Sequence, residues 1–177
     1  MPEDNPVNWY HPTDEEIAGY RKNHSRIPDS VYTIVQQWSV TVTADFIVRR
    51  RHLCGFYEYL LVTRAERPWK GKPFVPGGRM LPLETPLYAC IRNVSRELGF
   101  VPKAEHISFV GTVPVLNPES QSGGGPWSSL WLLHIVDLQS GDIIRLDRTG
   151  VQAVWTPCIM SEYVEPVRQA LALAGCK

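Results

Sequence analysis

The chain has no surplus of charge, few cysteines and no long apolar run. Its 18 basic and 18 acidic side chains cancel to a formal net charge of zero, which argues against a broad basic surface for nucleic acid. The four cysteines lie far apart without metal-ligand spacing, as expected for reduced thiols. No apolar stretch approaches the ~20 residues that span a bilayer. We therefore expect neither nucleic acid nor a membrane as a partner.

The N-terminus also lacks the marks of an exported protein. MPEDNPVNWYHP is polar and acidic, and no basic segment is followed by an apolar one. A secretory signal requires both. We therefore expect a cytoplasmic protein.

A chain of 177 residues with 44% hydrophobic and 20% charged side chains is long enough for one α/β domain with a full core. Residues 28–177 are expected to form that domain, and residues 1–27 an N-terminal extension. Within the extension, Thr13 begins a capping-box pattern that predicts a short helix over Thr13–Asn23. A second short helix is expected over Val31–Gln36.

Alternating and β-branched residues indicate a series of strands. They are expected at 39–49, 56–64, 107–115, 128–138 and 151–155, with a short extended segment at 73–76. A final helix capped by Ser161 is expected after the last strand. Strands, a helix, more strands and a last helix predict an α/β sandwich with a mixed sheet.

The central helix has clear boundaries in the sequence. Thr85 fits the N-cap, Pro86 fits the first helical position, and Gly99 fits the left-handed residue that ends a helix. Apolar residues recur at helical spacing and are expected to form its buried face. They are Leu87, Ile91, Val94 and Leu98.

The segment around this helix carries most of the functional information. Gly78 is followed after five residues by Glu84, after seven more by Arg92, and then by Glu97 just before the closing glycine. Two adjacent glycines let the backbone approach a ligand closely, although alone they are most often only a tight turn. One carboxylate and one backbone carbonyl, completed by water and phosphate oxygens, suit Mg²⁺. Glu84 and Arg92 are expected to form a structural pair.

This spacing resembles the Nudix box, with several of its acids replaced. Asn93 and Arg96 stand where the box has acids, so a single carboxylate, Glu97, remains on that face of the helix. One metal ion is then the limit. The resemblance implies an α/β fold of the Nudix type, an α/β/α sandwich with a mixed β-sheet.

A wider stretch of the chain, about residues 28–156, is similar to the GDP-mannose mannosyl hydrolases, a Nudix branch that also lacks most box acids. The matching segments are Asp45–Val48, Leu60–Leu61 with Arg64, Arg67–Pro68, Phe74–Arg79 and Glu97–Gly99. The resemblance implies a hydrolase that converts a GDP-mannose-like nucleoside-diphosphate sugar to free sugar and nucleoside diphosphate. Water attacks the anomeric carbon, and one Mg²⁺, or Mn²⁺ instead, assists the leaving diphosphate.

The same resemblance assigns roles to individual residues. Arg64, Arg67 and Arg79 would bind the diphosphate and sugar, and Asp45 would bind a sugar hydroxyl. The Gly78 carbonyl and Glu97 would hold the metal. The residues expected to act in catalysis are Arg64, Arg79 and Glu97.

One part of the resemblance fails. The branch has a Gln-His pair that supplies a metal ligand and the general base, and here Thr149-Gly150 stand in its place. Gln152 or Asp147 are alternative ligands. The base comes from Glu119 or His134, or is absent, and His134 in its apolar strand is more typical of a packed core histidine.

Trp127 and Trp131 could stack on a nucleotide base, although core packing is the commoner role of a tryptophan. Two other functions stay open on the sequence. One is a Nudix pyrophosphohydrolase that acts on an ADP-sugar or a nucleotide. The other is a non-catalytic nucleotide-sugar binding protein. The resemblance also implies a homodimer in which N-terminal elements complete the partner's nucleotide site.

Overall fold

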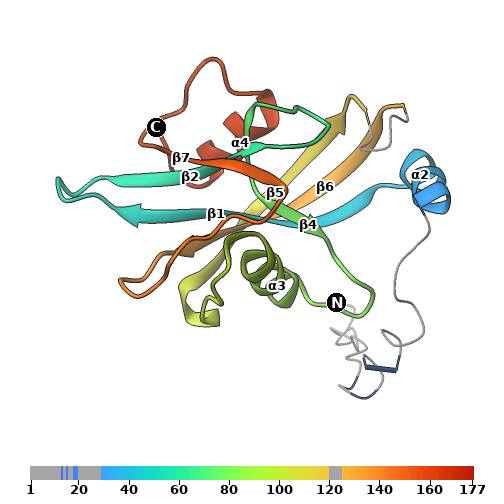
Figure 1. Cartoon of the computed structure of the whole chain (residues 1–177), viewed down its shortest axis with the longest axis horizontal. Coiled ribbons are helices and arrows are strands. Elements are labelled where there is room, and N and C mark those ends of the chain that lie inside the picture. The colour runs from blue at the N-terminus through green and yellow to red at the C-terminus, as the bar shows by residue number, and fades with distance from the viewer. Residues whose placement is uncertain (1–12, 14, 16–17, 20–28, 120–124) are drawn as a thin grey trace, which may run out of the picture.

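The structure, a computed structural model, describes residues 13, 15, 18–19, 29–119 and 125–177 (Figure 1). Most of the proposed extension 1–27, including most of the helix expected over Thr13–Asn23, lies outside the described residues. The central part of the glycine-rich loop before Pro126 lies outside them too. The division into an extension and one domain therefore stays a prediction.

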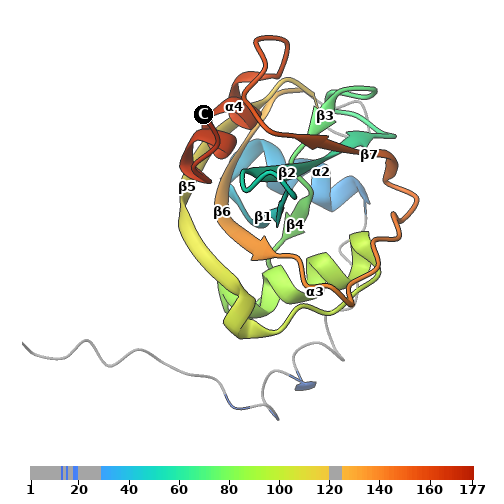
Figure 2. The same ribbon diagram turned by 90° about the vertical axis from the view of Figure 1, so that its left-hand side faces the viewer.

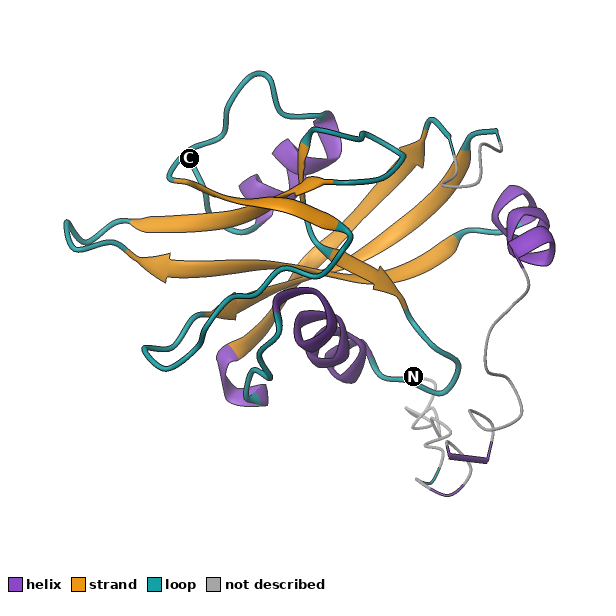
Figure 3. Ribbon diagram, viewed as in Figure 1, coloured by secondary structure: helices purple, strands orange, loops and turns teal. Residues whose placement is uncertain are grey.

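The described elements follow the order expected from the sequence, with strands before and after a central helix (Figure 3). They are α2 Asp29–Trp38, β1 Thr41–Arg51, β2 Tyr57–Arg64, β3 Pro73–Phe74, β4 Gly77–Arg79, α3 Pro86–Leu98, the 3-10 helix Ala104–His106, β5 Ile107–Asn117, β6 Trp127–Asp137, β7 Gly150–Thr156 and α4 Glu165–Leu173.

The strands form one mixed, open sheet. Its order is β3-β2-β1-β6-β5, with β4 added on β1 and β7 added on β2. Strands β1 and β6 pair in parallel from Thr41 opposite Ser129 to Arg49 opposite Asp137, and the other pairs are antiparallel. The mixed α/β sheet predicted from the sequence is confirmed.

Helices cover both faces of this sheet (Figure 2). Successive strand residues point to opposite faces, so β1 sends Ile47 into one apolar cluster and Phe46 into the other. The first cluster is closed by α4, which contributes Val167, Ala170 and Leu171. The second is closed by α3, which contributes Ala89, Cys90, Val94 and Leu98. This gives the three layers of an α/β/α sandwich.

Both predicted ends of α3 are confirmed. The Thr85 hydroxyl accepts a hydrogen bond from the Tyr88 amide at 3.3 Å, and Pro86 occupies the first turn. Gly99 has φ of 74°, and its amide donates to the Ser95 carbonyl at 3.1 Å. A left-handed residue costs least when it is glycine.

The buried face of α3 differs in part from the prediction. Val94 and Leu98 are fully buried as expected, but Leu87 and Ile91 are only half-buried. In their place Asn93 and Glu97 are buried. The helix is turned so that these two polar side chains reach the backbone of β1 and β4.

The last helix begins later than the sequence suggested. Ser161 lies in a turn, and α4 starts at Glu165 with Val164 as its N-cap and no side-chain capping bond. Pro166 fits the first turn of a helix because its missing amide is not needed there. The proline sets the start, and the prediction of Ser161 as the cap was wrong.

Candidate functional site

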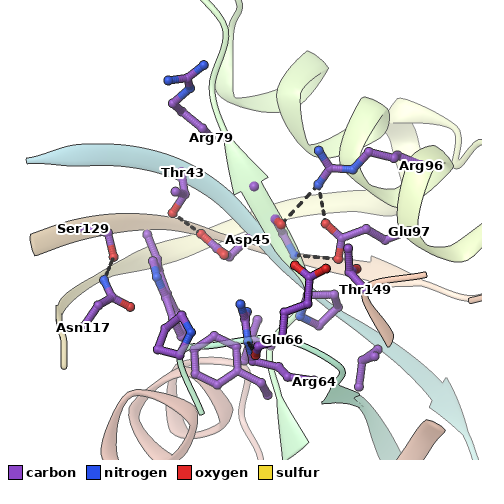
Figure 4. A pocket seen from close by; sticks show the side chains of 18 of the residues that line it. Thr43, Asp45, Arg64, Glu66, Arg79, Arg96, Glu97, Asn117, Ser129 and Thr149 are labelled. Atoms are coloured by element: carbon purple, nitrogen blue, oxygen red, sulfur yellow. Dashed lines mark hydrogen bonds and ion pairs between the residues drawn. The ribbon is translucent and has the colours of Figure 1, made fainter. Parts of the chain in front are cut away.

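A cavity of about 770 Å³ opens where β1, β4 and α3 meet the end of β2 and the loop before β7 (Figure 4). It contains five of the six site residues proposed from the sequence. They are Asp45, Arg64, Gly78, Arg79 and Glu97. Arg67, the sixth, does not line this cavity.

Close approach of the backbone explains the two adjacent glycines. Strand β4 pairs with β1, and a Cβ on Gly77 would lie 2.6 Å from the Asp45 Cα. A Cβ on Gly78 would lie 2.7 Å from an Arg96 guanidinium nitrogen. A side chain at Gly77 would displace the strand, whereas one at Gly78 would displace the guanidinium, so the pairing of β4 with β1 requires glycine at position 77.

Glu97 is held from two sides at the wall of the cavity. Its carboxylate accepts a hydrogen bond from the Gly77 amide at 3.2 Å and is ion-paired with Arg96. The side chain is 10% exposed, whereas that of Arg96 is 50% exposed. Burial raises the pKa of Glu97, against the lowering effect of the Arg96 charge.

Asn93 fills a place where an acid would not fit as well. Its Nδ2 donates to the Ala44 carbonyl at 2.9 Å and to the Gly78 carbonyl at 3.0 Å. Its Oδ1 accepts from Arg92 Nη1 at 3.0 Å. A carboxylate has no hydrogen to donate to two carbonyls, so the amide fixes the distance between α3, β1 and β4.

These contacts do not fit a metal ion between Gly78 and Glu97. The Gly78 carbonyl already accepts from Asn93, and the Glu97 carboxylate is paired with Arg96. Among the residues that the structure describes, no three or more His, Cys, Asp or Glu side chains form a group that could hold a metal. The metal role of these two residues stays an untested prediction, and no chemical step below is assigned to a metal.

Asp45 lies deep in the cavity wall on β1. It is 5% exposed and accepts a hydrogen bond from the Thr43 hydroxyl. Burial raises the pKa of the Asp45 carboxyl well above its ordinary value, and the nearby charge of Glu97 raises it further. A group of this kind can donate or accept a hydrogen bond with a sugar hydroxyl.

Arg64 and Arg67 lie at the end of β2 but have different surroundings. The Arg64 guanidinium is 4.9 Å from the centre of the Phe74 ring, and its Nη2 donates to the Arg67 carbonyl at 3.3 Å. Burial lowers the pKa of Arg64, which stays charged. Arg67 instead points to Glu119, with 3.1 Å between Nη1 and Oε2.

The two base candidates proposed from the sequence both lie outside the cavity lining. His134 is 2% exposed, with Nδ1 2.9 Å from the Leu132 carbonyl, and burial lowers its pKa. It packs edge-on against Phe109 and is a core histidine. Glu119 is ion-paired with Arg67. The acids that do line the cavity are Asp45, Glu66, Glu97 and Asp147.

Of the alternative ligands named from the sequence, Asp147 lines the cavity and Gln152 is exposed on β7. Asp147 accepts two hydrogen bonds from Thr149, at 2.8 Å from the amide and 2.6 Å from the hydroxyl. These bonds fix the loop before β7, beside the end of β2, where Arg64 pairs with Gly150.

Aromatic side chains form the other end of the cavity. Trp131 is 3% exposed and packs edge-on against Phe74, with 5.2 Å between ring centroids. Its main role is therefore core packing. Trp127 is half-buried, and its indole nitrogen donates to the Glu119 carbonyl at 3.1 Å. Trp127 is the better placed of the two tryptophans to contact a ligand base.

Several cavity residues were not assigned to the site from the sequence. Arg96 and Arg148 add cations, and Asn117 donates to the Ser129 hydroxyl at 3.0 Å in a buried pair. Arg148 precedes β7 in a loop with no motif, so no local pattern could have identified it. The sequence did single out Arg96, because it is a basic residue at a position where the Nudix box has an acid.

The sheet, the two helical layers and the cavity beside the glycine pair together define an α/β protein. The profile of the NUDIX domain family matches residues 40–166. The chain belongs to the Nudix family. None of the curated proteins matches the chain significantly.

Solved structures with the same fold have low sequence identity. A MutT NUDIX hydrolase from Burkholderia pseudomallei superposes with a TM-score of 0.58 at 18% identity, covering 76% of this chain and 98% of that one. The NUDIX domain of Shewanella oneidensis NrtR, in complex with ADP ribose, superposes with a TM-score of 0.52 at 18% identity, covering 81% of this chain and 82% of that one. A MutT/nudix family protein from Enterococcus faecalis superposes with a TM-score of 0.54 at 16% identity, covering 82% of this chain but 56% of that chain.

These likenesses show the fold. They do not identify a substrate for this chain. None of the helices in the described part of the chain is long and apolar enough to cross a membrane.

Proposed function

We propose that this Nudix protein binds a nucleoside-diphosphate sugar in the cavity and hydrolyses it to free sugar and nucleoside diphosphate. The observation that supports the proposal is that four arginines from separate segments line one cavity. The four arginines are Arg64 from β2, Arg79 from β4, Arg96 from α3 and Arg148 from the loop before β7. Guanidinium groups are well suited to bind phosphate oxygens in pairs.

In this proposal Arg64 and Arg79 bind the diphosphate on opposite sides, and Asp45 contacts a sugar hydroxyl. Arg67 would act at the rim, where Glu119 holds it. The leaving diphosphate gains negative charge as the sugar–oxygen bond breaks, so fixed cations beside it stabilise the transition state. A GDP-mannose-like sugar nucleotide is the substrate that the similarity of residues 28–156 favours.

Water activation falls to a carboxylate of the cavity, because His134 lies in the core away from the lining. A raised pKa makes a carboxylate a stronger base once it is ionised. Both Asp45 and Glu97 have raised pKa values because they are buried. Of the two, Glu97 is already paired with Arg96, so Asp45 is the better candidate for contact with the water or the sugar.

One observation favours a second function, a binding protein without turnover. The carboxylate of Glu97 is engaged by Arg96 and by the Gly77 amide, which leaves it a poor base or ligand. Such a protein would keep the arginines and the cavity and would bind the sugar nucleotide unchanged.

We also propose a homodimer, in keeping with the similarity to the mannosyl hydrolases. A run of apolar side chains is exposed on α2 and just before β1. Ile34 is 57% exposed, Trp38 86% and Val40 59%. Gln36 of the same helix lines the cavity. A partner packed on α2 would therefore lie close to the ligand site, and contiguous exposed apolar surface is typical of an interaction site.

A panel of nucleotide sugars with product analysis tests the proposed function. GDP-mannose, GDP-glucose and ADP-ribose would be incubated with the protein and the products separated by anion-exchange chromatography. Free sugar with nucleoside diphosphate supports the proposal. Sugar phosphate with nucleoside monophosphate indicates a pyrophosphohydrolase. Thermal stabilisation by the sugar nucleotide without any product indicates a binding protein.

A further inference from the structure

The guanidinium of Arg96 occupies an unusual position beside the glycine pair. One of its nitrogens lies 3.3 Å from the Gly77 carbonyl and is ion-paired with the Glu97 carboxylate (Figure 4). The same nitrogen is 2.7 Å from where a Cβ of Gly78 would be. The cation is thus enclosed by backbone on one side and by a largely buried carboxylate on the other.

A backbone carbonyl and a carboxylate on either side of a cation are the oxygen ligands that a divalent ion would use. In this chain both oxygens are satisfied by N–H groups of Arg96 instead. The neighbouring Asn93 completes the replacement, because its amide donates to the Gly78 carbonyl at 3.0 Å. Where oxygen ligands would hold a metal ion, this chain places the Arg96 guanidinium and the Asn93 amide.

We propose that Arg96 supplies the positive charge of a metal ion from within the chain, so that this site binds a diphosphate without a divalent cation. The proposal rests on the proposed function, since it assumes that the cavity takes a nucleoside diphosphate. The side chain of Arg96 is 50% exposed and lines the cavity. It can therefore keep its contacts with Gly77 and Glu97 and still offer N–H groups to a phosphate oxygen.

The pairing with Glu97 gives the guanidinium a fixed place. A free arginine side chain loses rotamer freedom when it binds an anion, whereas the contacts with Glu97 and Gly77 hold this one before the ligand arrives. The absence of a side chain on Gly78 is part of the same arrangement, because any Cβ there would push the guanidinium away.

Calorimetric titration with GDP, in the presence of either EDTA or millimolar Mg²⁺, tests this directly. The wild-type protein is expected to bind GDP with similar affinity in both buffers. Arg96→Met should weaken binding in EDTA by roughly 10–100-fold, the loss of one charged hydrogen-bonding group. Arg96→Lys, which keeps the charge, should recover part of that loss.

Arg50→Met is the matched control. Arg50 is paired with Glu58 at 2.9 Å and does not line the cavity, so GDP affinity should be unchanged. If Arg96→Met fails to fold by circular dichroism, Arg96→Gln replaces it, because its amide can still donate to Glu97.

A second readout is direct metal binding, measured by the electron paramagnetic resonance signal of Mn²⁺ without nucleotide. The wild-type protein should bind Mn²⁺ no more tightly than Arg96→Met does. GDP binding by the wild type only when Mg²⁺ is present would overturn the proposal, and so would full affinity of Arg96→Met in EDTA. Failure of the wild type to bind GDP in either buffer would instead overturn the proposed function.

Discussion

Arg92 and Glu84 form a two-point ion pair that joins the loop after β4 to α3. Arg92 Nε lies 2.7 Å from Glu84 Oε1, and Nη2 lies 2.8 Å from Oε2. The same Nη2 donates to the Arg79 carbonyl at 3.0 Å, and Glu84 accepts from the Leu81 amide at 2.9 Å. The ion pair predicted from the sequence is confirmed, and it reaches the backbone of Arg79.

Replacing Arg92 with Met should therefore destabilise the protein strongly. The Glu84 side chain is 2% exposed, and it would be left as a buried carboxylate without its partner. Breaking such a pair costs about 3 kcal/mol, measured as the change in free energy of unfolding in urea. Lys103→Met is the control, since Lys103 is 77% exposed and its 3.8 Å pair with Glu105 contributes little. Equal stability of both variants would contradict a structural role for Arg92.

Gly77→Ala should disrupt the site through its backbone. The added Cβ would lie 2.6 Å from the Asp45 Cα, a distance that side-chain rotation cannot relieve. We expect a loss of about 1–3 kcal/mol of stability, typical of overpacking, together with a loss of ligand binding. Gly141→Ala serves as the control, because nothing lies within 4 Å of its added Cβ. A stable Gly77→Ala variant that binds ligand normally would show that the close approach is unimportant.

Asp45→Asn should stabilise the protein at neutral pH. Folding raises the pKa of Asp45 above its ordinary value of 3.8. The protonated side chain therefore contributes fully to stability below pH 3.8, and this contribution is lost as the pH rises through the folded-state pKa. Asn avoids the cost of a buried charge. Each kcal/mol gained raises Tm by roughly 2–4 °C for a chain of this size.

Melting curves of both proteins between acid and neutral pH check this. The two Tm values should converge at the acid end and separate as the pH rises. A Tm difference that is constant with pH would mean that the pKa of Asp45 is the same in the folded and unfolded states.

Arg64→Met should weaken ligand binding far more than Arg67→Met. Arg64 lines the cavity, whereas Arg67 is 60% exposed and paired with Glu119. We expect a loss of roughly 10–100-fold for Arg64 and no more than a few-fold for Arg67. Calorimetric titration with GDP measures both. Equal losses would give Arg67 the substrate-binding role that the resemblance first suggested.

The homodimer is tested by light scattering at micromolar concentration. The proposal predicts a particle of twice the chain mass of 20.1 kDa, which the double variant Ile34→Glu, Trp38→Glu should reduce to a monomer. Leu53→Glu is the control, since Leu53 is fully exposed on the β1–β2 hairpin away from α2. A 20.1 kDa wild-type particle would contradict the proposal.

The parts of the fold that depend on local signals were predictable from the sequence. Thr85, Pro86 and Gly99 define the ends of α3 because capping acts over a few residues. Strand positions followed from alternation. The parallel pairing of β1 with β6 is a long-range contact for which the sequence contains no local pattern.

The sequence predicted which residues lie together in the candidate site, but not how their side chains are paired. The spacing brought Gly78 and Glu97 to one cavity, as the structure has them. The position of Arg96 depends on the rotation of α3 against the backbone of Gly77, and the pairing of Arg67 depends on Glu119, 52 residues away. Such side-chain geometry is set by tertiary packing.

The central claim is that water attacks the sugar carbon of a nucleoside-diphosphate sugar in this cavity. Hydrolysis of GDP-mannose in ¹⁸O-labelled water, followed by mass spectrometry of both products, tests it most directly. The proposal predicts the label in free mannose and unlabelled GDP. Label in GDP, or formation of GMP and mannose phosphate with label in either, would contradict it.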